Sequence, residues 1–289
     1  MSHAHHPIVA SLWIFVALSL IAIAYLDRWM RVAWLVPDGV KTWRAWSFYL
    51  GMLLLWMGLG SSLSVLDHDL LTAHMVQHLL LMTLAPPLIL LGAPLKLMPR
   101  LVQEVAELTA SVRRLSRSVL HPMVGWIAAT AVLVVWHIPS VFMLGLRSPM
   151  WHAVEESSFL ISGLLFWRPV VSPSSNTFKW PESSILLYLF LATLPCDILS
   201  GFLVFCDRVV YPVYSSSASA SRFGLTALED QQCAGALMWT CVTLVYLIAG
   251  SVFATRLLSS HLSANDPSPK PQPQTIAAAH RDAQTIEAY

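Results

Sequence analysis

The stretch Asp67-His68-Asp69-Leu70-Leu71-Thr72-Ala73-His74-Met75-Val76-Gln77-His78 begins an apolar run that continues to Pro94. A run of this length predicts a membrane-spanning helix. Because His74 and His78 are four residues apart, both rings leave one face of that helix, and Gln77 lies on the same side. Ionisable side chains inside a span are costly, so their default interpretation is functional. The two imidazoles therefore predict a site for a transition metal or a haem.

The composition of the whole chain also indicates a membrane protein. Of its 289 residues, 56% are hydrophobic and only 11% are charged, and the mean hydropathy is +0.63. This is far more apolar than a soluble domain, so the lipid bilayer is the expected environment. The net charge of +1 gives no indication of nucleic acid as a partner. Four cysteines without a CxxC pair do not form a disulfide framework.

The apolar runs predict an all-α fold, a polytopic membrane protein built as a bundle of seven transmembrane helices. The expected spans are residues 8–26, 47–66, 70–93, 123–138, 150–171, 184–205 and 233–257. We divide the chain into an extracytoplasmic tail (residues 1–7), a transmembrane domain (8–258) and a disordered cytoplasmic tail (259–289). The last segment is polar and rich in proline, which is typical of disorder.

The distribution of basic residues predicts the orientation. Fourteen of the 17 Lys and Arg residues fall in the first, third and fifth linkers and the C-terminal segment. These segments lie on one side of a seven-span protein. Since cytoplasmic segments are enriched in Lys and Arg, we expect the N-terminus outside and the C-terminus in the cytoplasm.

With that orientation, candidate ligands collect on the extracytoplasmic side, where His74 and His78 lie in the outer half of their span. His137 ends the 123–138 run at the outer boundary. His152, Glu155 and Glu156 share one face at the outer start of the next span, because they are spaced i, i+3, i+4. This mixture of imidazole and carboxylate, with thiol and thioether groups nearby, suits copper. Haem is the alternative cofactor, since imidazoles on facing helices serve as axial ligands.

Several of these residues also have a purely structural interpretation. His74 and His78 can be packing histidines that hydrogen-bond across helices. His152, Glu155 and Glu156 can form an interhelical polar clasp or a proton path instead of a ligand set. His137, directly before Ile-Pro, can simply end a helix.

The sulfur-containing residues are expected at two depths in the membrane. Near the outer surface, Cys206 and Cys233 could form an oxidised pair. Deeper in the spans, Cys196 and Cys241 are expected to be small core residues, and Met238 and the other methionines to be packing residues.

Three sequence blocks stand out along the chain. The first runs from His74-Met-Val-Gln-His78 through Ala85-Pro-Pro87 to Leu91-Gly-Ala-Pro94. The second includes Trp136-His-Ile-Pro139 and Arg147-Ser-Pro-Met-Trp-His-Ala-Val-Glu155. The last is Asp230-Gln-Gln232 with Ala234-Gly235 and Met238-Trp239. Together these blocks resemble one known family, the CtaG-like cytochrome c oxidase assembly proteins of bacterial membranes. The resemblance covers the second to the seventh span. It implies a seven-helix protein of the bacterial inner membrane that helps to mature a haem-copper oxidase, with copper supply as the usual proposal. It does not imply a catalytic step.

The resemblance also assigns candidate ligands position by position. The matching positions are His74, His78, His137, His152, Glu155 and Asp230. The chain departs from the family pattern at two places, where Glu156 replaces a histidine and Cys233 replaces a leucine. These two residues complete the candidate metal set, with the Cys233 thiol as a substitute for the missing imidazole.

The expected partners are the oxidase subunits and other copper chaperones. Two other functions remain open from the sequence alone. One is a haem-binding electron carrier of the membrane, and the other is a metal-free scaffold that docks oxidase subunits.

Overall fold

The computed structural model is all-helical over the residues it describes, which are 5–35, 41–61, 66, 69–94, 121–171, 181–216 and 224–265. The helices are α1 (His5–Leu35), α2 (Thr42–Gly60), α4 (Leu71–Leu79), α5 (Ala85–Leu91), α9 (Pro122–Trp136), α10 (Pro139–Arg147), α11 (Pro149–Val171), α12 (Glu182–Phe205) and α14 (Ala227–Asn265). A π-helical turn, η1 (Leu80–Leu84), joins α4 to α5, and a 3₁₀ turn, η3 (Pro212–Ser216), precedes α14. The predicted all-α class is confirmed for these residues.

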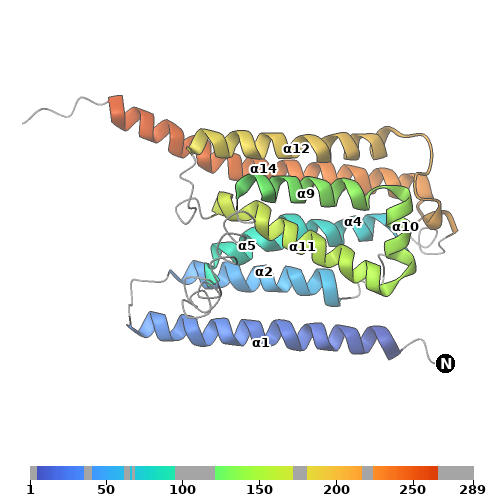
Figure 1. The fold of residues 1–289 in the computed structure, drawn as a ribbon, viewed down its shortest axis with the longest axis horizontal. Helices are drawn as coiled ribbons and strands as arrows, with labels where there is room; N and C mark the ends of the chain where they lie inside the picture. The colour runs from blue at the N-terminus through green and yellow to red at the C-terminus, as the bar shows by residue number, and fades with distance from the viewer. Residues whose placement is uncertain are drawn as a thin grey trace, which may run out of the picture.

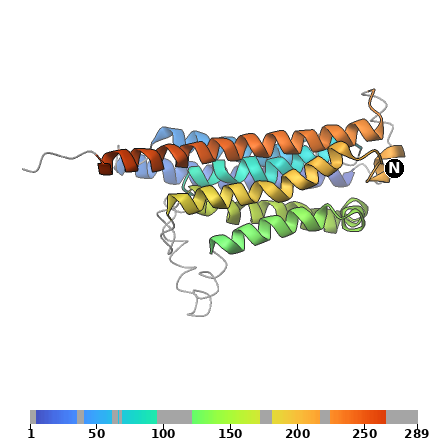
Figure 2. The ribbon, with the colours of Figure 1, turned by 90° about the horizontal axis from the view of Figure 1, so that it is seen from above.

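The long helices run side by side along one axis and alternate in direction, while α10 lies across one end of the bundle (Figure 1). The view in Figure 2 shows α10 nearly end-on, which agrees with the 81° bend between α9 and α10. The N-terminus of α1 and the starts of α4 and α11 lie at the end that carries α10. The polar candidates predicted for one side of the membrane therefore come from helix ends that are neighbours in space.

Within the described part of the chain, four helical segments are long and apolar enough to cross a membrane: Leu12–Leu35, Leu71–Leu91, Ser183–Phe205 and Ala227–Ser259. The bent pair of α9 and α10 counts as a fifth if it is one broken span. The predicted spans 47–66 and 150–171 correspond to α2 and α11. The first of these is rich in Trp and Gly, and the second carries Glu155, Glu156 and Arg168, so neither reaches the same apolarity.

The outer surface of the bundle is apolar. Trp13, Ile198, Phe205 and Leu247 are each more than 60% exposed. In water, so many exposed apolar side chains would be an aggregation surface, whereas against lipid tails they are well solvated. The surface chemistry therefore agrees with a membrane protein.

The path of the chain between α4 and α5 follows from its prolines. Pro86 has no N–H to donate, and its ring excludes the carbonyl of Met82 four residues earlier. The helix widens to the π form at η1, and the indole Nε1 of Trp167 in α11 donates to the Met82 oxygen at 3.2 Å. Gly163 in α11 packs directly on this turn, because a Cβ there would lie 2.7 Å from the same oxygen. These contacts hold α11 against the helix that carries His74 and His78.

The second break in the chain comes at Ile138-Pro139. A residue before proline avoids the helical region, and Ile138 has an extended backbone. The α9 helix therefore ends at Trp136 and the chain turns into α10. The hydroxyl of Tyr211 donates to the His137 carbonyl at 2.8 Å, which ties this corner to the segment that follows α12.

At its far end, α14 continues to Asn265, beyond the predicted limit of the transmembrane domain at residue 258. The rest of the predicted tail (residues 266–289) and the start of the N-terminal tail (1–4) lie outside the described residues.

Candidate metal centre

A group of three buried polar side chains lies between α4 and α11. His74 and Glu155 are 0% exposed and His78 is 5% exposed. One ligand atom from each residue falls within 4.8 Å of the others. His74 and His78 reach this point together because one helical turn separates them, and Glu155 comes from the second turn of α11.

The distances in this group match those of ligands around one small ion. The Oε1 atom of Glu155 lies 3.4 Å from the Nε2 atom of His74 and 3.3 Å from that of His78. Two ligand atoms, each about 2.0–2.1 Å from a tetrahedral metal ion, are about 3.3 Å apart. Both separations are longer than a good N–H···O hydrogen bond. Among the residues that the structure describes, the ring nitrogens of His74 and His78 and both carboxylate oxygens of Glu155 have no hydrogen-bond partner.

Orphaned polar atoms in a dry interior are costly, so this arrangement has to be explained. A cation bound to both Nε2 atoms and to the carboxylate removes the penalty, since it satisfies all three residues at once. The residues present therefore fit a metal ion, with two imidazoles and one carboxylate as ligands.

Aromatic rings enclose the cluster. The ring of Phe159 stacks on His78 with centroids 4.0 Å apart, and Phe142 meets His74 at 4.9 Å. Both phenylalanines are 1% exposed. On the α10 side, the backbone of Gly145 approaches so closely that a Cβ there would collide with Oε2 of Glu155. The walls exclude water and fix the positions of the ligand side chains.

His152 and Glu156 continue the cluster toward the outside of the protein. The His152 ring lies between the two carboxylates, with Nδ1 3.7 Å from Glu155 Oε2 and Nε2 3.4 Å from Glu156 Oε1. The side chains of His152 and Glu156 are 14% and 16% exposed, in contrast to the closed inner group. They form the partly exposed side of the cluster.

Gln77 holds this outer part in position. Its Nε2 atom donates to the backbone oxygen of Gly58 in α2 at 2.9 Å and to Oε1 of Glu156 at 2.6 Å. The amide thus connects α2, α4 and α11 at the rim of the cluster. The helical spacing placed Gln77 on the face of His74 and His78, but only the structure shows which groups it contacts.

His137 lies beside the cluster. Its ring centroid is 6.2 Å from that of His78, but its Nε2 atom is directed at the sulfur of Met75, 3.4 Å away. The structure brings this imidazole close to the histidines of α4, yet the group of three closely spaced ligand atoms does not include it.

Asp230 has a structural partner instead of a place in the cluster. Its carboxylate accepts hydrogen bonds from the backbone N–H groups of Leu71 and Thr72 at 2.7 and 3.1 Å, and from the Thr72 hydroxyl at 2.6 Å. A carboxylate at these positions satisfies the free N–H groups at the start of α4 and complements the helix dipole. The structure therefore supports a capping role for Asp230.

The neighbours of Asp230 are structural as well. Gln231 accepts from the N–H of Val210 at 2.7 Å and donates to the carbonyl of Arg208 at 3.1 Å, which fixes the segment between α12 and α14. Cys233 is an exposed free thiol. The Asp230-Gln-Gln232 motif thus anchors the start of the last helix, and Cys233 lies outside the three-residue group.

The sequence interpretation missed the residues that surround the ligands. Phe142, Phe159 and Gly145 carry no metal-binding chemistry, and no spacing rule connects them with the histidines. Met75 lies inside the His74–His78 motif, but a buried methionine is ordinarily a packing residue. The close approach of Gly145 to Glu155 depends on the bend at Pro139, which a sequence pattern does not locate in space.

The fold and the site together define an all-helical protein with apolar helices and a buried cluster of two imidazoles and one carboxylate near one end of the bundle. The sequence model of the cytochrome c oxidase caa3 assembly factors (Caa3_CtaG) matches residues 23–260. The chain therefore belongs to this family, as the three sequence blocks indicated. Comparison with curated proteins and with solved structures gave no match.

Proposed function

We propose that this protein binds copper at His74, His78 and Glu155 and delivers it to a haem-copper cytochrome c oxidase during assembly. Membership of the family connects the chain with cytochrome c oxidase. The observation that carries the copper proposal is the convergence of three buried ligands, none with a hydrogen-bond partner among the described residues. Both histidine–carboxylate separations are close to the tetrahedral value. Imidazole and carboxylate ligands bind copper, zinc or iron. Of these metals we choose copper, because the proposed recipient is a haem-copper oxidase.

In this proposal the chain spans the bacterial inner membrane seven times, with the cluster near the extracytoplasmic face. The basic residues support this orientation. Arg28 and Arg31 near the end of α1, Lys41 and Arg44 at the start of α2, and Arg168 near the end of α11 all belong to helix ends opposite α10 (Figure 1). Since the cytoplasmic side attracts Lys and Arg, the α10 end faces outward.

The transfer step is ligand exchange without a change of oxidation state. Copper arrives past Glu156 and His152 and binds the inner three ligands. A site with only three protein ligands keeps a position free, so a donor of the partner protein can attach before the last bond to this chain breaks. No bond in the protein is made or broken apart from those to the metal.

The first experiment measures the metal content of full-length protein purified in detergent from cells grown with copper. It compares the unaltered site with His74→Ala/His78→Ala and Glu155→Gln, all with the N-terminal His3, His5 and His6 replaced. We expect both variants to hold one copper ion per chain fewer than the protein with the unaltered site. His121→Asn is the matched control, because asparagine preserves the cap that His121 provides for Met123.

The same variants are then tested for oxidase maturation in cells. We expect the two site variants to lose oxidase activity while His121→Asn retains it. Zinc or iron in place of copper would contradict the choice of metal. A Soret band in the purified protein would support the haem carrier, and full maturation with both site variants would support the metal-free scaffold.

A further inference from the structure

His137 and Met75 form a pair whose chemistry requires a third partner. The Nδ1 atom of His137 lies 2.7 Å from the carbonyl oxygen of Leu133. A carbonyl only accepts hydrogen bonds, so Nδ1 carries the proton. In the neutral ring, Nε2 is then an electron-pair donor and has no hydrogen to offer.

That Nε2 atom is 3.4 Å from the sulfur of Met75, and a thioether also has no hydrogen to donate. The two groups are buried, at 6% and 0% exposure. Two electron-pair donors thus face each other in a dry interior. Protonation of the ring would supply a donor, but at the cost of a buried charge in an apolar wall. A bound cation satisfies both atoms.

The separation of the two atoms fits a metal ion. With bonds of about 2.0 Å to nitrogen and about 2.3 Å to sulfur, an N···S distance of 3.4 Å corresponds to an angle at the ion of roughly 105°. This is close to the tetrahedral value. The hydrogen bond of Nδ1 to the backbone fixes the ring orientation, as is common for histidines that ligate metals.

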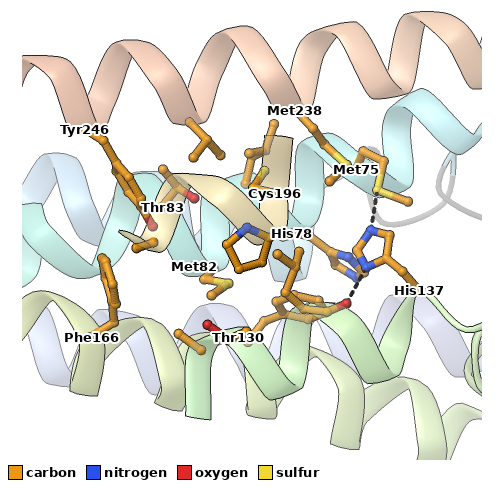
Figure 3. Close-up of a pocket in the computed structure, with 17 residues that line it drawn as sticks. Met75, His78, Met82, Thr83, Thr130, His137, Phe166, Cys196, Met238 and Tyr246 are labelled. Atoms are coloured by element: carbon orange, nitrogen blue, oxygen red, sulfur yellow. Dashed lines mark hydrogen bonds between the residues drawn. The ribbon is translucent and has the colours of Figure 1, made fainter. Parts of the chain in front are cut away.

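Other sulfur-containing side chains line the same cavity as this pair. His137 and Met75 line a partly enclosed cavity of about 40 Å³, and the buried side chains of Cys196 and Met238 line it too (Figure 3). His137 directly follows α9, and the other three groups come from α4, α12 and α14. Room of this size holds a few water molecules or an ion. Thioether and thiol sulfur with one imidazole is a donor set that selects Cu(I).

His78 connects this cavity with the three-ligand cluster. It lines the cavity wall, and its ring centroid is 6.2 Å from that of His137. We propose that His137 and Met75, with Met238 and Cys196 beside them, form a second, sulfur-rich Cu(I) site into which His78 passes copper from the first. This inference rests on the proposed function for the identity of the metal. Copper remains Cu(I) in both sites, so the exchange needs no oxidant or reductant.

The test uses full-length protein labelled with selenomethionine and loaded anaerobically with Cu(I). X-ray absorption at the copper edge then detects selenium bound to copper. We expect a copper–selenium signal that is lost in Met75→Leu, since leucine preserves apolar volume but removes the thioether. Met52→Leu is the matched control, because Met52 is also buried but packs against Tyr25 and Phe48, away from the cavity. It should retain the signal.

A second readout separates this inference from the proposed function. Counting Cu(I) per chain by competition with a chromogenic chelator should give two in the unaltered protein and one in Met75→Leu. Copper bound with nitrogen and oxygen neighbours only would overturn the sulfur site and leave the proposed function intact. A selenium signal of undiminished strength in Met75→Leu would also overturn it. No bound copper in the unaltered protein would overturn both.

Discussion

Glu155 is the residue on which the cluster depends. It is the only carboxylate within reach of both inner imidazoles among the described residues, and its two oxygens have different neighbours. Oε1 faces His74 and His78, while Oε2 faces His152 and the backbone of Gly145. The orientation of this one side chain therefore decides whether three ligand atoms meet at a point.

Gly145→Ala tests this orientation without removing a ligand. The added methyl group occupies the space of Oε2, so the carboxylate must rotate away from the histidines. We expect copper affinity to fall about 10- to 100-fold, the usual effect of disturbing a group that positions a metal ligand. The measurement is copper affinity by chelator competition, with the thermal midpoint recorded in parallel.

The control is Gly201→Ala in α12, where the added methyl group meets only Trp239, at 3.8 Å. Its copper affinity should equal that of the unaltered protein. Unchanged affinity in a folded Gly145→Ala protein would show that Glu155 does not need this orientation to bind.

Among the elements, α4 carries both inner histidines and depends on two contacts with other helices. Asp230 in α14 caps its start, and α11 packs against the π turn at its end. The first contact fixes the turn that contains His74. The second fixes where α11, and with it Glu155, lies along α4. The geometry of the site is thus determined by how α4 is held at both ends.

Asp230→Ala removes the cap and leaves the N–H groups of Leu71 and Thr72 without a partner. We expect the free energy of unfolding to fall by about 1–3 kcal/mol, the cost of unsatisfied buried donors. Denaturation in detergent measures this change. Cys233→Ser, an exposed substitution on the same helix, should stay within about 0.5 kcal/mol of the unaltered protein.

The same variant separates a capping role from a ligand role. The copper content of the folded Asp230→Ala protein should match that of the unaltered protein. Copper lost at undiminished stability would instead identify Asp230 as a ligand.

Gly163→Ala tests the second contact of α4. The added Cβ would lie 2.7 Å from the oxygen and 2.9 Å from the Cα of Met82, and backbone atoms in a packed helix cannot move aside easily. We expect a loss of stability of about 1–3 kcal/mol from overpacking, measured as the same free energy of unfolding. Gly250→Ala in α14 has its nearest neighbour at 3.9 Å and should show no such loss. Equal stability of the two variants would mean that α11 can withdraw from the π turn at little cost.

Helical spacing predicted much of this arrangement. It placed His74 with His78 and His152 with Glu155 on shared faces, and the structure brings these two faces together. It could not assign partners across the bundle. From the sequence, Asp230 is an acidic residue at the predicted outer boundary, whether it serves as a metal ligand or as a helix cap. Only its position opposite the start of α4 shows that it is a cap. Met75 and His137 are 62 residues apart in the sequence, so their contact depends on how α4 and α9 pack.

At the scale of the whole molecule, the alternating helices divide the chain into two chemically different ends. The end with α10 contains the histidine and carboxylate cluster, the Asp230 cap and the exposed Cys233 thiol. At the other end, Arg256 lies near the close of α14, together with the basic ends of α1, α2 and α11. The cluster lies at the α10 end, and the proposed orientation puts this end outside the cytoplasm. Together, the two proposals therefore place copper binding on the extracytoplasmic side.

Thiol labelling in intact cells checks that claim. With Cys196, Cys206 and Cys241 replaced by serine, Cys233 is the one thiol left and is exposed at the α10 end. We expect a membrane-impermeant maleimide, added from outside, to label it before the cells are permeabilised. The matched control replaces Cys233 as well and adds Ser259→Cys, an exposed position near the opposite end of α14. That thiol should react only after permeabilisation. The reverse pattern would place the cluster on the cytoplasmic side, and copper would then have to reach the oxidase from within the cell.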